Sequence, residues 1–155
     1  MSVQAAEPWV TAPLAQFIED ARVRLAVLMH PSGQVLGQAG FSRSTDVMSA
    51  CALAAAINAS AAELGRLLDG KPFSGLHVAG RDQHVFLGLA PVSRGTLLLL
   101  CVFDSSTSIG LVQMFFEEFR ARIAAQSPST QEAPKLAADF ESELNRNLAA
   151  LFGRI

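Results

Sequence analysis

Thr96-Leu-Leu-Leu-Leu-Cys-Val-Phe-Asp-Ser-Ser-Thr-Ser-Ile-Gly110 is the stretch that decides the fold predicted for this chain. Residues 96–103 are apolar at nearly every position, whereas a strand with one solvated face alternates polar and apolar residues. The run is also too short to cross a bilayer as a helix, which takes about 20 apolar residues. Asp104 and the serines after it are typical helix-capping residues. We therefore expect a central strand covered by protein on both faces, followed by an amphipathic helix.

Hydrophobic periodicity and turn residues predict the elements around this strand. A first helix is expected from about Ala12 to Arg22, and the longest helix from about Asp46 to Leu68. Two strands form an opening hairpin, and three later strands follow one another through short connections, so they run antiparallel. The order of elements is αββαβββα, with strands expected at residues 24–29, 34–39, 74–79, 84–90 and 96–103.

The composition changes after Ala125, where a polar, proline-bearing stretch precedes a separate amphipathic segment. The predicted organisation is a flexible tail over 1–11, a domain over 12–125, a linker over 126–134 and a C-terminal amphipathic helix over 135–155. Its apolar stripe contains Phe140, Leu144, Leu148, Leu151 and Phe152, which must be buried against the chain itself, a sister subunit or a partner. We expect neither a secretory signal nor a transmembrane segment.

Half of the residues are hydrophobic (50%) and only 17% are charged, with a net charge of -2. This charge gives no electrostatic footprint for nucleic acid. The apolar surplus instead favours a buried subunit interface. The two cysteines, Cys51 and Cys101, lie in apolar contexts, which predicts buried thiols and a cytoplasmic location.

The long helix is built of small residues on nearly every side, and its charges lie only at its ends. A helix with one solvated face should carry a charged stripe, so both faces of this helix are predicted to be buried. This pattern predicts a homodimer whose interface includes Val47, Cys51, Ala52, Ala55, Ala59 and Ala62.

No catalytic constellation is found in the sequence. Gly65 and Gly70 followed by Lys71 have the glycine spacing of a P-loop, but Pro72 stands where Ser or Thr is required. His84 near Arg81 and Asp82 is interpreted as part of a surface hairpin, and zinc would need paired Cys or His ligands. We therefore expect a binding protein, with no enzymatic activity, no cofactor and no metal.

Two stretches resemble a known family. Leu25-Ala-Val-Leu-Met-His-Pro-Ser-Gly-Gln-Val-Leu-Gly-Gln-Ala-Gly40 is similar to the first hairpin of Roadblock/dynein-light-chain domains. Leu99-Leu-Cys-Val-Phe-Asp-Ser-Ser-Thr-Ser-Ile-Gly-Leu-Val112 resembles the second recurrent stretch of that family, a strand followed by Asp, a polar turn, Gly and the last helix.

The resemblance implies one five-stranded antiparallel sheet in an α/β (α+β) fold of three layers. The long helix would cover one face, and the first and last domain helices the other. In the family two long helices pair across a two-fold axis and the third strands can join edge to edge. This adds Leu76 and Val78 to the predicted dimer interface.

The C-terminal stretch Leu144-Asn-Arg-Asn-Leu-Ala-Ala-Leu-Phe-Gly-Arg154 resembles that of MglB-type bacterial polarity regulators. These are homodimers that bind the Ras-like GTPase MglA and stimulate its GTP hydrolysis. The resemblance implies a homodimeric regulator of a small GTPase that acts on the GTPase's own switch loops, without stable membrane insertion. Phe140, Leu144, Leu148, Leu151 and Phe152 are the expected partner-binding residues.

Alternatives remain open at this stage. The protein could be a Roadblock scaffold that assembles other proteins without affecting nucleotide turnover, and a small-molecule sensor is a third class. The C-terminal helix could pack on its own dimer instead of a partner. A supplied arginine finger is the sharper mechanism, with Arg43, Arg66 and Arg81 as candidates.

Overall fold

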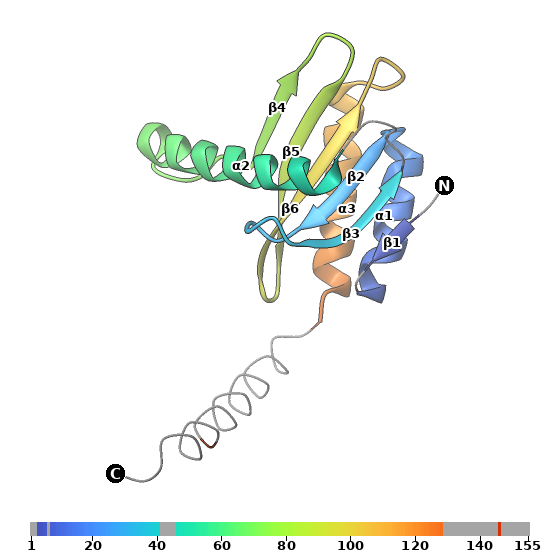
Figure 1. Cartoon of the computed structure of the whole chain (residues 1–155), viewed down its shortest axis with the longest axis horizontal. Coiled ribbons are helices and arrows are strands. Elements are labelled where there is room, and N and C mark those ends of the chain that lie inside the picture. The colour runs from blue at the N-terminus through green and yellow to red at the C-terminus, as the bar shows by residue number, and fades with distance from the viewer. Residues whose placement is uncertain (1–2, 6, 41–45, 129–145, 147–155) are drawn as a thin grey trace.

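The computed structural model describes residues 3–5, 7–40, 46–128 and 146. In this part of the chain one sheet of six strands has the order β1-β3-β2-β6-β5-β4, and every neighbouring pair is antiparallel (Figure 1). The strands are β1 (Val3–Ala5), β2 (Leu25–Met29), β3 (Val35–Gly40), β4 (Gly75–Ala79), β5 (His84–Val92) and β6 (Gly95–Phe103). The helices are α1 (Pro8–Ala21), α2 (Val47–Asp69) and α3 (Ile109–Gln126).

The predicted α/β fold and its antiparallel sheet are confirmed, with one added strand and an earlier start to the first helix. Residues 3–5 form β1, which pairs with the outer edge of β3, and α1 begins at Pro8. The expectation of a flexible tail over 1–11 is therefore wrong for residues 3–5 and 8–11. Proline at the first helical position is pre-organised for the helix and lacks only an N–H that would be unpaired there. Val10 then joins the core with no exposed surface.

The central strand β6 lies between β2 and β5 and is buried on both faces, as its continuous apolar run predicts. Leu97, Leu99 and Cys101 pack on one side of the sheet, whereas Leu98 and Leu100 pack on the other. This alternation is the one expected for successive residues of a strand.

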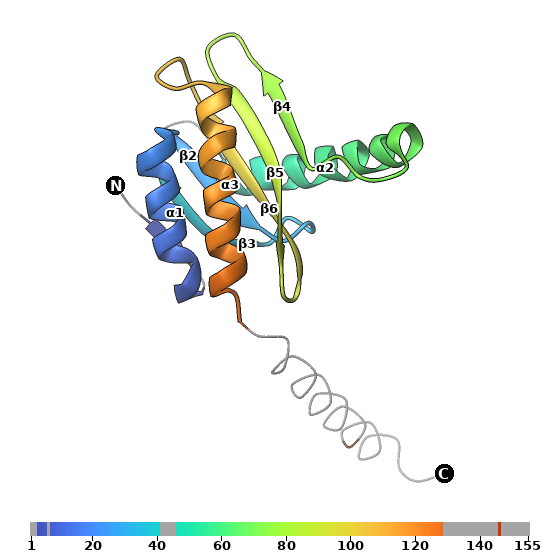
Figure 2. The ribbon, with the colours of Figure 1, turned by 180° about the vertical axis from the view of Figure 1, so that it is seen from behind.

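One face of the sheet is covered by α1 and α3, which lie side by side across it (Figure 2). Aromatic rings pack between the two helices and beneath them: the ring centroids of Phe17 on α1 and Phe119 on α3 are 5.5 Å apart, and those of Phe86 on β5 and Phe116 on α3 are 5.2 Å apart. The absence of a side chain at Gly88 makes room for Phe116, because a Cβ there would lie 2.4 Å from its ring. We call this side the closed face.

The opposite face carries only α2, and we call it the open face. The first half of α2 crosses the strands, and its second half projects past β4 (Figure 1). Cys51 and Ala54 are buried against the sheet, in a cluster with Leu98 and Leu100. Gly70 ends the helix in the left-handed conformation, with φ of 75°, as its position before Pro72 predicts.

The segment between β6 and α3 is fixed by Asp104, although Ser108 and not Asp104 is the N-cap of α3. Asp104 accepts hydrogen bonds from the hydroxyl and the N–H of Ser106, and Arg24 Nε donates to it at 2.6 Å. The Ser106 hydrogen bonds, and then the Arg24 cation, lower the pKa of Asp104 to about 2. This carboxylate thus connects the start of β2 to the loop that follows β6.

Candidate protein interaction surface

The open face exposes large apolar side chains along α2. Each of them has between 42% and 82% of its surface exposed, although large apolar residues are normally inside a protein. They are Met48, Leu53, Ile57, Leu64, Leu67 and Leu68. An apolar stripe of this length, spread over about four turns, marks an interaction site. We call Leu53, Ile57, Leu64, Leu67 and Leu68 the leucine stripe.

The leucine stripe has the spacing of a helix that packs against another helix. Leu53, Ile57, Ser60, Leu64 and Leu67 follow one another at intervals of four, three, four and three residues. This alternation keeps the side chains on one side of a helix and is the seam pattern of paired helices. A shallow groove of about 410 Å³ runs along the stripe, with the small residues Ala56, Ser60 and Ala61 at its base. Small residues at such positions allow a second helix to approach closely.

The structure separates the interface residues predicted on α2 into distinct groups. Cys51 is buried against the sheet of its own subunit, and Val47 packs against the same cluster. Ala52 and Ala55 lie beside the turn between β2 and β3, where a Cβ added at Gly33 would lie 3.8 Å from both. Ala59 is exposed and Ala62 is half-buried. Val47 and Cys51 thus face the sheet, Ala52 and Ala55 lie beside the turn, and none of the predicted residues belongs to the leucine stripe.

Sequence reasoning missed the leucine stripe because it weighed the many alanines of α2 more than its few leucines. The signal was present as the four-three spacing from Leu53 to Leu67. That spacing spans about two heptads, which is too short to indicate a long coiled coil but sufficient for one helix pair.

The edge strand β4 adjoins the projecting half of α2. It pairs with β5 on one side only, and Val78 is 47% exposed whereas Leu76 is half-buried. An unpaired strand edge presents N–H and C=O groups that another strand can pair with. β4 and the leucine stripe therefore form two adjoining parts of one interaction surface.

By length and mean hydropathy (1.5), α2 would also pass for a membrane span. The sheet argues against that role. α2 connects β3 to β4, and both strands belong to the same sheet. A bilayer crossed by α2 would place them on opposite sides of the membrane. The apolar surface of α2 is better explained by contact with protein.

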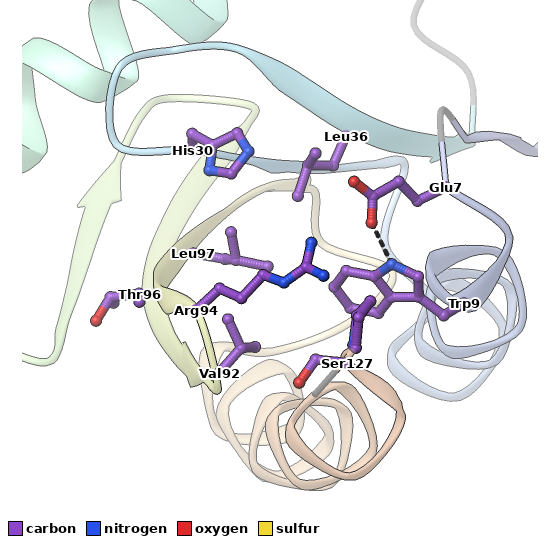
Figure 3. A pocket seen from close by; sticks show the side chains of 11 residues that line it. Glu7, Trp9, His30, Leu36, Val92, Arg94, Thr96, Leu97 and Ser127 are labelled. Atoms are coloured by element: carbon purple, nitrogen blue, oxygen red, sulfur yellow. Dashed lines mark hydrogen bonds between the residues drawn. The ribbon is translucent and has the colours of Figure 1, made fainter. Parts of the chain in front are cut away.

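A small pocket lies where α3 ends, between the first residues of α1 and the β5–β6 turn (Figure 3). Its volume is about 60 Å³, which suits a few water molecules. Trp9 Nε1 donates a hydrogen bond to the Glu7 carboxylate, and Arg94 extends toward the Trp9 ring with His30 at the far side. The pocket therefore joins α1, α3 and the β5–β6 turn and offers little space to a substrate.

The two cysteines and the P-loop-like glycines have structural roles. Burial raises the pKa of both the Cys51 and the Cys101 thiols, which keeps them in the unreactive protonated form. Gly65 lies inside α2 and Gly70 closes it, so this P-loop-like spacing falls at the carbonyl end of a helix, which repels phosphate. Within residues 3–5, 7–40, 46–128 and 146, no three His, Cys, Asp or Glu side chains come together as a metal site.

The predicted partner-binding residues Phe140, Leu144, Leu148, Leu151 and Phe152 lie outside the described residues, and so does Arg43. Of the other arginine-finger candidates, Arg66 pairs with the Glu63 carboxylate one helical turn away. Arg81 lies exposed in the turn between β4 and β5.

No protein-family model matches the chain, and no curated protein matches it in sequence. Solved structures do match. MglB of Myxococcus xanthus is 22% identical, with a TM-score of 0.69 over 77% of this chain and 95% of that chain. The gliding protein MglB of Thermus thermophilus is 20% identical, with a TM-score of 0.70 over 77% and 88%. A Roadblock/LC7 domain from Streptomyces avermitilis is 16% identical, with a TM-score of 0.61 over 72% and 91%.

These similarities and the observed topology define a Roadblock-type fold. Within it the arrangement is similar to that of the MglB structures, each of which matches 77% of this chain. The predicted Roadblock/MglB-type fold is thus confirmed.

Proposed function

We propose that the protein is a homodimeric, cytoplasmic regulator of a small Ras-like GTPase of the MglA type. The observation that carries the proposal is the exposed leucine stripe on the open face of a Roadblock/MglB-type fold. The closed face completes its core within one subunit, whereas on the open face the outer side of α2 keeps large apolar side chains exposed. A second copy of the chain supplies an apolar helix of matching length.

A two-fold dimer fits this surface because both subunits then use the same patch. The leucine stripe of one α2 would pack along that of the other. Adjacent β4 edges would extend this contact, and Val78 would become buried with them. A continuous surface on the far side of the dimer would remain for the GTPase.

The protein would regulate the GTPase by rearranging the switch loops of that partner. Of the arginine-finger candidates, Arg66 is already paired with the Glu63 carboxylate, which leaves the exposed Arg81 as the candidate within the described residues. An arginine finger must be free to reach the transferred phosphate. The segment with Phe140, Leu144, Leu148, Leu151 and Phe152 is proposed as the second contact with the GTPase.

A binding and turnover experiment tests this function. The full chain is mixed with an MglA-type GTPase loaded with GDP or with a non-hydrolysable GTP analogue, and single-turnover GTP hydrolysis is measured. We expect state-selective binding and faster hydrolysis. The variant Leu148→Asp should lose this response while its melting temperature stays that of the native protein. Equal binding to both nucleotide states with unchanged hydrolysis would contradict regulation.

The second candidate is a scaffold that assembles a protein complex without affecting nucleotide turnover. It is favoured by one observation: the interaction surface combines an apolar contact along the leucine stripe with a strand-pairing contact at the edge of β4. The same experiment separates the two functions, because a scaffold would bind independently of the nucleotide.

A further inference from the structure

Two histidines come together on the strand hairpin at the edge of the sheet. His77 lies at the middle of β4 and His84 at the start of β5, on the same side of the sheet. His77 Nε2 and His84 Nδ1 are 3.2 Å apart. Both side chains are accessible to solvent, and His77 also borders an open groove of about 340 Å³ between β4 and α3.

The two imidazoles are held by a buried aromatic ring. Phe103 at the end of β6 is 2% exposed, and its ring centroid lies 5.8 Å from that of His77 and 5.2 Å from that of His84. The planes of all three rings lie within 25° of one another. Stacking on a fixed ring reduces the rotamer entropy that each imidazole would lose on binding a ligand.

We propose that His77 and His84 form a binding site for a borderline transition-metal ion such as Zn²⁺ or Ni²⁺. Zinc–imidazole bonds are about 2.0–2.1 Å long, so two nitrogens on one tetrahedral ion lie roughly 3.3 Å apart. The observed separation of 3.2 Å already matches that value. Small rotations of the two rings would direct both lone pairs at an ion beside the line that joins the nitrogens.

The ion would take the place of the hydrogen that the two nitrogens now share. One imidazole donates its N–H to the other in the metal-free pair. On binding, that proton moves to the outer nitrogen of the same ring, so both inner nitrogens present lone pairs. Because only neutral imidazoles bind metal, the affinity should fall as the solution is acidified.

The donor set determines which ions fit. Imidazole suits Zn²⁺, Ni²⁺ and Cu²⁺, whereas Mg²⁺ and Ca²⁺ require oxygen ligands. The part of the chain that the structure describes adds no third His, Cys, Asp or Glu to the pair. The remaining coordination positions would therefore hold water, as in sites with an open position. The bound ion would connect the edge strand β4 to β5.

Isothermal titration of the tag-free full chain with Zn²⁺ and with Ni²⁺ tests the site. We expect saturable binding at one ion per chain, and none with Mg²⁺. The variants His77→Gln and His84→Gln should each weaken binding at least tenfold. The chain has three histidines, so His30→Gln, which lies in the pocket beside Trp9, is the matched control and should bind as the native protein does.

A second measurement separates loss of the site from loss of the fold. Saturating Zn²⁺ should raise the melting temperature of the native protein and of His30→Gln by several degrees, because it binds the folded state. The melting temperatures of metal-free His77→Gln and His84→Gln should stay close to the native value and show no response to Zn²⁺. Native binding in both His77→Gln and His84→Gln, or loss of binding in His30→Gln, would overturn the proposal. Because this site does not depend on nucleotide-state binding, its failure would leave the proposed GTPase regulation untouched.

Discussion

Both faces of the sheet are covered by helices and carry buried apolar side chains, but the helix on the open face, α2, also exposes a row of large apolar residues. On the closed face α1 and α3 bury an aromatic core that includes Phe17 and Phe119. On the open face α2 contributes only Cys51 and Ala54 to the buried cluster and exposes its leucine stripe. The sheet thus has a buried core on each side, and the proposed association surface lies on the outer side of α2.

The largest effect is expected for Phe119→Ala, at the centre of the closed face. Phe119 is 1% exposed and its ring packs against Phe17. Loss of the ring should lower the free energy of unfolding by about 3–5 kcal/mol, because a cavity remains between the two helices. Urea unfolding at two protein concentrations measures this loss in the free energy of unfolding. If the destabilisation caused by Phe119→Ala depended strongly on protein concentration, Phe119 would lie in a subunit interface and not in the core of one subunit.

The central strand should respond equally on its two sides. Leu99 packs on the closed face and Leu100 on the open face, and both are almost fully buried. Leu99→Ala and Leu100→Ala should each lower the free energy of unfolding by ~2–5 kcal/mol. If Leu100→Ala had no effect, α2 would not seal the open face over β6, and the comparison between the faces would fail.

The leucine stripe should affect association and leave the subunit stable. Leu64→Glu would bury two unpaired carboxylates at a two-fold dimer interface, which together should cost at least about 3 kcal/mol, or roughly 100-fold in the dissociation constant. The monomer should change by less than about 0.5 kcal/mol, because Leu64 is 51% exposed there. Analytical ultracentrifugation measures the dissociation constant of the dimer. Denaturation of the dilute protein measures the free energy of unfolding of the monomer.

Ala59→Arg is the matched variant on the other side of α2. Ala59 is exposed and lies away from the leucine stripe, so we expect its dimer to persist. If Ala59→Arg were monomeric and Leu64→Glu remained a dimer, the dimer interface would include Ala59 and not the leucine stripe.

The smallest effect is expected for Asp104→Asn, in the connection between β6 and α3. The pKa of Asp104 is lowered from 3.8 to about 2 in the folded protein by its bonds to Ser106 and Arg24. Its stabilising contribution is therefore present above about pH 4 and lost as the pH falls toward 2. The difference in stability between the native protein and Asp104→Asn should shrink over that range in thermal unfolding. A difference that stays constant from pH 6 to pH 2 would contradict this role.

The sequence was sufficient where local patterns and burial agree. The uninterrupted apolar run of β6 predicted a strand buried on both sides, and the helical pattern over residues 46–68 predicted α2 nearly to its end at Asp69. It was insufficient for β1, because three residues carry too little periodicity to be recognised and their pairing with β3 is a long-range contact. The face of α2 that remains exposed was also missed. Which side of a helix meets the sheet is decided by tertiary packing, and alanines suit either side.

The mass of the native protein in solution tests the central claim most directly. Sedimentation equilibrium of the full chain at micromolar concentration should give a mass of about 33 kDa, twice the 16.5 kDa of one chain. Leu64→Glu at the same concentration should give the mass of a single chain. A native protein that sediments at 16.5 kDa would show that no second copy covers the open face, and the account of α2 as a dimer surface would be wrong.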